Sequence, residues 1–195
     1  MKKIAIFLAA SSTLLAQMNV LVFAGSTRAE SYNKKLASEA AEIARNMGAK
    51  VTFINLKDFP MPFYDGDLEK EGMPANAKKF RNLMIANDVI VIACPEYNSS
   101  LPAVLKNALD WASRGENGGP SRDAFKGKQF ALLSTSPGQG GGARALAHLR
   151  AVIENVGGEV LENQVSVGTA HESLSDEKIG SVKQMIQDQL ALLAD

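Results

Sequence analysis

The fold is decided by residues 19–33, Asn-Val-Leu-Val-Phe-Ala-Gly-Ser-Thr-Arg-Ala-Glu-Ser-Tyr-Asn. Residues 19–24 are an apolar run with β-branched members that ends at Gly25, a pattern typical of a strand buried on both faces. From Asn33 to Met47 apolar side chains recur at helical spacing, and Gly48 stands where a helix ends. The stretch therefore predicts a buried strand, a loop rich in hydroxyl groups and a helix.

The same pattern recurs along the rest of the chain. Further strands are predicted over residues 51–56, 89–94, 129–135 and 160–167, and further helices over 75–87, 103–113, 143–156 and 176–193. Five strands alternating with five helices predict an α/β fold: a doubly wound, five-stranded parallel sheet of order 2-1-3-4-5 with helices on both faces. A ligand then lies at the carboxyl ends of strands one and three, where the strand order reverses.

Composition limits the classes of function. Lys plus Arg and Asp plus Glu both number 21 in 195 residues, so no charge surplus points to nucleic acid or to an anionic membrane. Cys94 is the only cysteine, which excludes an internal disulfide, and we interpret it as a small buried hydrophobe. His148 and His171, the only histidines, stand apart in the sequence, and we predict no metal site.

Residues 1–17 are treated apart from the predicted domain, residues 18–195. Met1-Lys2-Lys3 and the following apolar run resemble a secretory signal peptide, and the run is too short to span a bilayer, which takes ~20 apolar residues. Met18 opens the first strand as a natural start would, so residues 1–17 are either a signal peptide or a misread upstream start. We expect a cytoplasmic protein, or an exported, periplasmic one if the leader is cleaved.

The loop from Gly25 to Asn33 suits an anion. It runs from a buried strand into a helix start, where free backbone amides and the positive end of the helix dipole favour a phosphate. Ser26, Ser31 and Asn33 can hydrogen-bond phosphate oxygens, and Arg28 can make charge-assisted contacts. These residues alone support a second interpretation equally well, in which Ser31 only caps the helix and Arg28 is solvated. The loop lacks the fingerprints of nucleotide triphosphate and dinucleotide sites.

A second loop carries a resemblance to a known family. Residues 95–111 read P-E-Y-N-S-S-L-P-A-V-L-K-N-A-L-D-W and resemble the signature of the NADPH-dependent FMN reductase family of flavodoxin-like proteins, which includes chromate-, quinone- and azo-reducing enzymes. The G-S-x-R-x-x-S-x-N pattern of Gly25 to Asn33 is similar to the family's phosphate loop. The Ser- and Gly-rich residues 134–142 are similar to a third family motif. The resemblance covers residues 18–195.

The resemblance implies a bound FMN whose phosphate is held by the first loop and whose ring is lined by residues 95–98. The implied cofactor-binding residues are Ser26, Arg28, Ser31, Tyr32, Asn33, Pro95, Glu96, Tyr97, Asn98, Ser99, Ser134, Ser136, Gly138 and Gly141. Tyr97 could contact the flat ring, while backbone amides around Glu96, Asn98 and the glycines could meet its polar edge. No catalytic amino acid is expected, because the flavin carries the redox step.

The resemblance further implies NADPH or NADH as co-substrate, a ping-pong mechanism, broad acceptors (quinones, azo compounds, chromate, flavin), and a homodimer or homotetramer. No nucleic-acid partner and no membrane span are expected. The rival interpretations are a flavodoxin-like electron carrier and an FMN-binding redox sensor, neither of which oxidises NAD(P)H; overall neutrality disfavours the carrier, because carriers dock electrostatically. The polar connections 57–74 and 115–126 remain lids, partner surfaces or plain loops.

Overall fold

A computed structural model describes residues 18–194, so the predictions made for the leader lie outside the described residues. The strands are β1 (Asn19–Ala24), β2 (Lys50–Asn55), β3 (Val89–Ala93), β4 (Gln129–Thr135), β5 (Glu159–Val160) and β6 (Val165–Val167). All pairs are parallel, in the order β2-β1-β3-β4, with β5 and β6 both paired to the outer side of β4. The predicted order 2-1-3-4-5 is confirmed.

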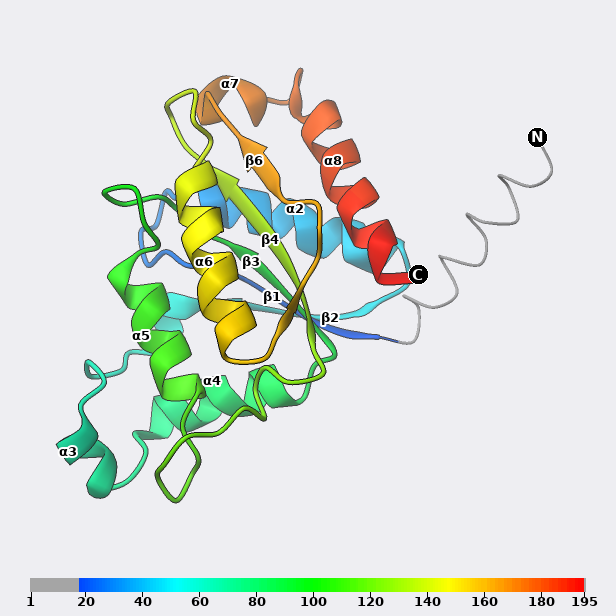
Figure 1. The fold of residues 1–195 in the computed structure, drawn as a ribbon. Coiled ribbons are helices and arrows are strands. Elements are labelled where there is room, and N and C mark those ends of the chain that lie inside the picture. Colours follow the sequence, from blue (N-terminus) through cyan, green and yellow to red (C-terminus); the bar gives the residue numbers. More distant parts are fainter. Residues whose placement is uncertain (1–17, 195) are drawn as a thin grey trace.

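Helices cover both faces of this sheet (Figure 1). They are α2 (Tyr32–Asn46), α3 (Gly66–Lys70), α4 (Ala75–Ile85), α5 (Ala103–Ala112), α6 (Ala143–Asn155), α7 (Ala170–Ser173) and α8 (Ile179–Ala191), with short 3-10 turns at Leu56–Asp58 and Leu192–Ala194. Helices α2 and α8 pack on one face, and α4, α5 and α6 pack on the other. The predicted doubly wound arrangement is therefore present.

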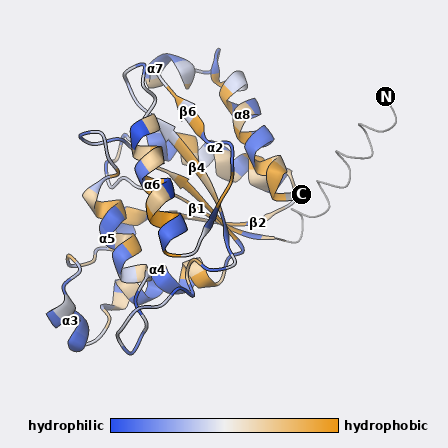
Figure 2. Cartoon of the chain, in the orientation of Figure 1, coloured by the Kyte–Doolittle hydropathy of each residue, from blue (hydrophilic) through white to orange (hydrophobic). Residues whose placement is uncertain are grey.

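Strand β1 shows why the central strands are apolar throughout. Val20 and Val22 face the layer of α2 and α8, whereas Leu21 and Phe23 face the layer of α4 to α6, and all four side chains are fully buried. Because side chains alternate between the faces of a strand, a strand covered on both faces needs apolar residues at every position. The middle of the sheet is accordingly largely orange in Figure 2.

The predicted fifth strand, residues 160–167, is interrupted. It forms β5 and β6, with residues 161–164 between them outside any strand. The Gln189 side chain of α8 donates from Nε2 to the carbonyl oxygens of Leu132 (3.2 Å) and Asn163 (2.6 Å), and Arg150 of α6 donates to those of Leu161 and Glu162. These two side chains take over the hydrogen bonding of the gap, which is why the ladder can break there.

The connection 57–74 contains α3 and is fastened to α5. Asn107 accepts from the Tyr64 amide (2.8 Å) and donates to the Pro62 carbonyl oxygen (2.9 Å), to which Trp111 Nε1 also donates (2.9 Å). The Glu69 carboxylate receives Arg114 Nε (2.7 Å) and Nη2 (2.9 Å), the Gly119 amide (3.0 Å) and the Tyr64 hydroxyl (2.9 Å). These hydrogen bonds fix the connection to α5 and disfavour a mobile lid; they fit a plain loop and a partner surface equally.

Candidate functional site

Three loops meet at the carboxyl ends of β1, β3 and β4, where the sequence places the ligand. The Gly25 amide donates to the Ala93 carbonyl oxygen (2.9 Å), and the Cys94 amide donates to that of Leu133 (2.7 Å), so the loops leave the sheet side by side. A Cβ at Gly25 would lie 2.8 Å from Leu105 Cδ2, so glycine lets the first loop pass α5 closely without displacing the Leu105 side chain.

The β1–α2 loop keeps polar groups without protein partners. Ser31 occupies the N-cap of α2 with extended backbone, yet its side chain makes no capping hydrogen bond. Within residues 18–194 the Arg28 guanidinium forms no ion pair and no hydrogen bond, and Ser26 Oγ accepts only from the Arg28 amide (3.3 Å). An uncapped helix start beside a free guanidinium and two hydroxyl groups fits a phosphate.

Asn33 lies behind this loop and holds it to the sheet. Its Nδ2 donates to the Thr135 carbonyl oxygen (2.8 Å), and its Oδ1 accepts from the Thr135 amide (3.1 Å), with the whole side chain buried. The sequence suggested Asn33 as a phosphate ligand. In the structure both ends of its amide group fix the start of α2 against the end of β4.

The β3–α5 loop forms a tight turn over residues 97–100. Tyr97 and Ser100 exchange backbone hydrogen bonds (2.9 and 3.0 Å), and the two residues between them, Asn98 and Ser99, have φ of 49° and 65°. Positive φ at both central positions is the pattern of a type I′ turn, in which asparagine is well tolerated. The turn presents Tyr97 with 48% of its surface exposed, so the ring is free to contact a ligand.

Two neighbours of this turn point away from solvent. Cys94 is fully buried, and burial raises the pKa of its thiol to about 12, which removes any thiolate at neutral pH. The Glu96 carboxylate is turned toward the start of α6, where Arg144 Nε donates to its Oε1 (2.8 Å). Hydrogen bonds from Arg144 hold the pKa of Glu96 below its ordinary value, so this carboxylate stays ionised.

The β4–α6 loop, residues 136–142, is shaped by its glycines. Gly141 and Gly142 have φ of 59° and 87°, and a Cβ on Gly141 would lie 2.9 Å from Val167 backbone atoms. Ser134 sits beneath the loop, fully buried, and donates to the Cys94 carbonyl oxygen (2.6 Å). Ser136 Oγ donates to the Gly138 carbonyl oxygen (3.0 Å). Backbone amides, more than side chains, are what this loop can offer a ligand.

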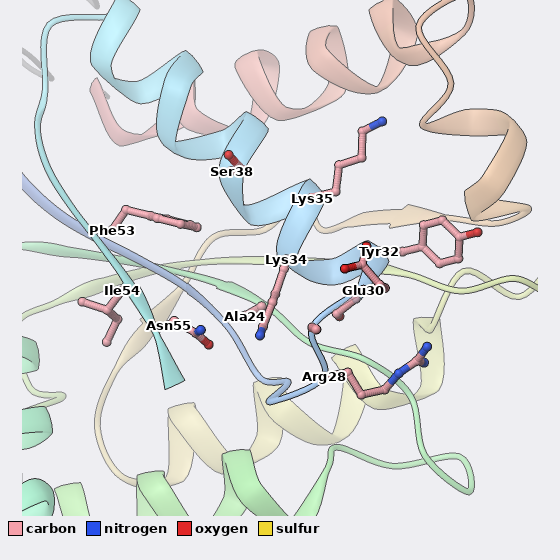
Figure 3. Close-up of a pocket in the computed structure, with 12 residues that line it drawn as sticks. Ala24, Arg28, Glu30, Tyr32, Lys34, Lys35, Ser38, Phe53, Ile54 and Asn55 are labelled. Carbon is pink, nitrogen blue, oxygen red and sulfur yellow. The ribbon is translucent and has the colours of Figure 1, made fainter. Parts of the chain in front are cut away.

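A hollow of about 640 Å³ lies beside the β1–α2 loop, the expected phosphate loop, between α2 and the end of β2. Its lining includes Arg28, Ser31, Tyr32, Phe53 and Asn55, and no residue of the other two loops. Figure 3 shows Arg28 and Tyr32 directed away from Phe53. The hollow therefore shares the phosphate loop with the expected site and does not include the ring-binding part.

Sequence reasoning missed Arg144. A basic residue in the first turn of a helix is placed against the helix dipole, and this unfavourable position is the signal that could have prompted a search for a carboxylate partner. Across residues 18–194, no three His, Cys, Asp or Glu side chains gather in a metal-binding group, and no helix is long and apolar enough to cross a membrane.

Comparison with known proteins gives one consistent result. A family model for NADPH-dependent FMN reductases matches residues 18–172. The chain is 38% identical over 133 residues to the NAD(P)H-dependent FMN reductase of Pseudomonas aeruginosa, covering 68% of each protein. It is 34% identical over 165 residues to the 2-hydroxy-1,4-benzoquinone reductase of a Burkholderia species, covering 85% of each. The flavoenzyme NAD(P)H:(acceptor) oxidoreductase of Paracoccus denitrificans has a TM-score of 0.76 at 28% identity, covering 91% of this chain and 97% of that one.

Proposed function

Because the chain belongs to the NADPH-dependent FMN reductase family, and is thus an oxidoreductase dependent on FMN and NAD(P)H, we propose that it passes hydride from NAD(P)H through FMN to quinones. The observation that carries this proposal is the start of α2, where an uncapped helix end meets the free Arg28 guanidinium at the switch point of the sheet. The Burkholderia relative, named for a benzoquinone, supports the choice of acceptor.

The phosphate end of FMN is proposed to bind the β1–α2 loop. Ser31 has a hydroxyl group without a capping bond, and the amides of the first turn of α2 need an acceptor. Arg28 can reach a phosphate with a forked, charge-assisted contact, and Ser26 and Tyr32 flank it. Asn33 supports this part of the site from behind, through its two bonds to Thr135.

The ring end is proposed to bind between the β3–α5 turn and the β4–α6 loop. Bound FMN supplies the redox centre, and the chain contributes position and hydrogen bonds. Tyr97 offers an exposed aromatic surface. The direct contacts proposed here come from Pro95, Tyr97, Asn98, Ser99, Ser136, Gly138 and Gly141, with the buried Ser134 supporting them from below.

The order of reaction and the wider acceptor range are part of the same proposal. NAD(P)H and the acceptor use one site in turn, which makes the kinetics ping-pong, and chromate, azo compounds and free flavin are further acceptors. We also propose a homodimer or homotetramer, supported by the exposed aromatic rings of Tyr97 in the β3–α5 turn and Phe63 in the connection 57–74.

The proposal is tested by an anaerobic absorbance experiment. The purified protein is reconstituted with FMN, freed of unbound flavin, and recorded before and after addition of NADPH, NADH and then a benzoquinone. The flavin band should bleach with the nicotinamide and return with the quinone, in single steps that establish the ping-pong order. The same additions to free FMN at equal concentration provide the control for uncatalysed reduction.

Two other outcomes would contradict the proposal in different ways. A bound flavin that stays oxidised after both nicotinamides would indicate a carrier or a sensor. Failure to retain FMN at all would remove the cofactor assignment itself.

A further inference from the structure

Glu96 is connected to a different loop from the one it belongs to. It precedes the β3–α5 turn, and its side chain, only 12% exposed, accepts from the Arg144 guanidinium. The backbone amides of Arg144 and Ala145 add to the guanidinium in lowering the pKa of this carboxyl. The N-cap of α6 is Gly142, which has no side chain and makes no side-chain cap. The Glu96 carboxylate therefore stands at a helix start that has no side-chain cap of its own, where free amides favour a negative charge.

A second contact joins the same turn to the same helix. His148, one turn after Arg144 on α6, has Nδ1 3.0 Å from Ser100 Oγ. Ser100 closes the turn through its paired backbone bonds with Tyr97. The residue before the turn and the last residue of the turn are thus both fastened to one side of α6.

The start of α6 is in turn fixed to the β4–α6 loop. Gly141 packs against the backbone of Val167, and Gly142 lies against Ser134, with positive φ at both glycines. The Thr169 amide also donates to the Gly138 carbonyl oxygen (3.0 Å). A displacement of α6 would therefore move the glycine loop and the Tyr97 turn together.

Electrostatics point the same way. Arg144 is 71% exposed and stands in the first turn of α6, where a cation is disfavoured by the helix dipole and a carboxylate is favoured. Glu96 lies at the helix end and neutralises Arg144 through its Oε1 atom. Its carboxylate is thus paired within the protein, whereas the Arg28 guanidinium has no partner among residues 18–194.

We propose that Glu96, acting through Arg144 and the first amides of α6, is a positioning residue that sets the distance between the two loops of the ring-binding half, while Asn33 holds the phosphate half to the end of β4 through Thr135. This inference rests on the proposed FMN function. It predicts that a substitution at Glu96 weakens binding of the flavin ring, and that a substitution at Arg28 weakens binding of the phosphate alone.

Riboflavin and FMN distinguish the two halves, because riboflavin has the ring without the phosphate. Glu96→Ala should weaken binding of both flavins by the same factor, about tenfold, the size expected when a helix cap and a charged hydrogen bond are lost. Arg28→Ala, the matched control in the phosphate half, should weaken FMN and leave riboflavin unchanged. Affinities are measured by quenching of flavin fluorescence, with thermal unfolding recorded for each variant.

A double-mutant cycle separates positioning from a direct contact with the ring. Arg144→Ala should weaken both flavins in the same direction, and the double variant should bind no more weakly than Glu96→Ala. Glu96→Gln, which can still accept from the α6 amides, should recover part of the affinity. Because Arg144 is largely exposed, Arg144→Ala keeps the test available if Glu96→Ala does not fold.

The proposal is overturned by unchanged riboflavin affinity in Glu96→Ala, or by additive effects of the two substitutions. It is equally overturned if Glu96→Gln shifts the flavin reduction potential and leaves affinity intact, since that would show a charge acting on the ring. If the unmodified protein binds neither flavin, the proposed function itself is refuted, independently of the role of Glu96.

Discussion

The β1–α2 loop and the connection 57–74 are both polar segments beside the site, and they differ in how their polar groups are used. In the first, Ser31 leaves the helix uncapped and Arg28 has no partner among residues 18–194. In the second, Glu69 receives four hydrogen bonds, and Asn107 and Trp111 hold the backbone. We take the unpartnered groups of the first segment as available to a ligand, whereas the hydrogen-bonded groups of the second hold the scaffold together.

The largest expected effect comes from removing a hydrogen-bonded group of the connection 57–74. Glu69→Ala removes the acceptor of Arg114, Tyr64 and the Gly119 amide at a nearly buried position, and should lower the free energy of unfolding by about 3 kcal/mol. Urea denaturation of the flavin-free protein measures the change. The FMN affinity of the folded variant should stay within a factor of about two of the unmodified protein, because Glu69 belongs to the connection 57–74 and not to the β1–α2 loop that binds the phosphate.

Asp67→Ala provides the matched control. Asp67 is acidic, lies in the same helix α3, and within residues 18–194 its carboxylate pairs with the exposed Lys70 alone (2.7 Å). Loss of such a surface pair changes stability by less than ~1 kcal/mol. Equal destabilisation by the two substitutions would show that the connection is not held by the Glu69 cluster.

The next largest effect comes from removing the unpartnered Arg28 side chain of the β1–α2 loop. Arg28→Ala should weaken FMN binding about thirtyfold, equivalent to about 2 kcal/mol for a charge-assisted phosphate contact, and should change unfolding of the flavin-free protein by less than ~0.5 kcal/mol. Arg28→Lys keeps the positive charge but loses the two-pronged guanidinium contact, so its FMN affinity should lie between those of the unmodified protein and Arg28→Ala. Isothermal titration with FMN measures the affinity.

With saturating FMN, NADPH turnover by Arg28→Ala should approach that of the unmodified protein. Equal FMN affinity in the two proteins would remove Arg28 from the phosphate site.

The smallest effect sharpens the comparison through pH. Hydrogen bonds from Arg114 hold the pKa of Glu69 below its ordinary value of 4.5, so the ionised carboxylate stabilises the fold above that value. This stabilisation is lost as the pH falls through the lowered pKa of the folded state. The difference in unfolding free energy between the unmodified protein and Glu69→Gln should therefore be constant near neutrality and narrow in acid.

Denaturant titrations of both proteins across the acid range test this dependence. A difference that does not change with pH would mean that the Glu69 charge contributes nothing.

The fold was predictable where burial is uniform and unpredictable where distant side chains intervene. Strands β1, β3 and β4 lie where their apolar runs indicate, because a strand covered on both faces has a simple pattern. The break between β5 and β6 depends on Gln189 and Arg150, which come from two helices elsewhere in the sequence. The polar residues 162–164 mark the interruption locally, but nothing in residues 160–167 names the side chains that stabilise it.

The site shows the same division. Its loops were predictable, since they follow from strand order alone. The use of individual side chains was not: Asn33 bonds to a residue 102 positions away, and Glu96 to one 48 positions away. For these residues the sequence indicates the right place and leaves the partner, and hence the role, open.

The interrupted edge formed by β5 and β6 bears on how the protein behaves when crowded. A continuous outer strand offers a row of unpaired amides and carbonyls on which another chain can add as a further strand, the first step toward aggregation. Here the edge is reduced to two- and three-residue strands, and Arg150 and Gln189 occupy the carbonyls between them. The break in the ladder thus protects this side of the sheet from edge-to-edge association.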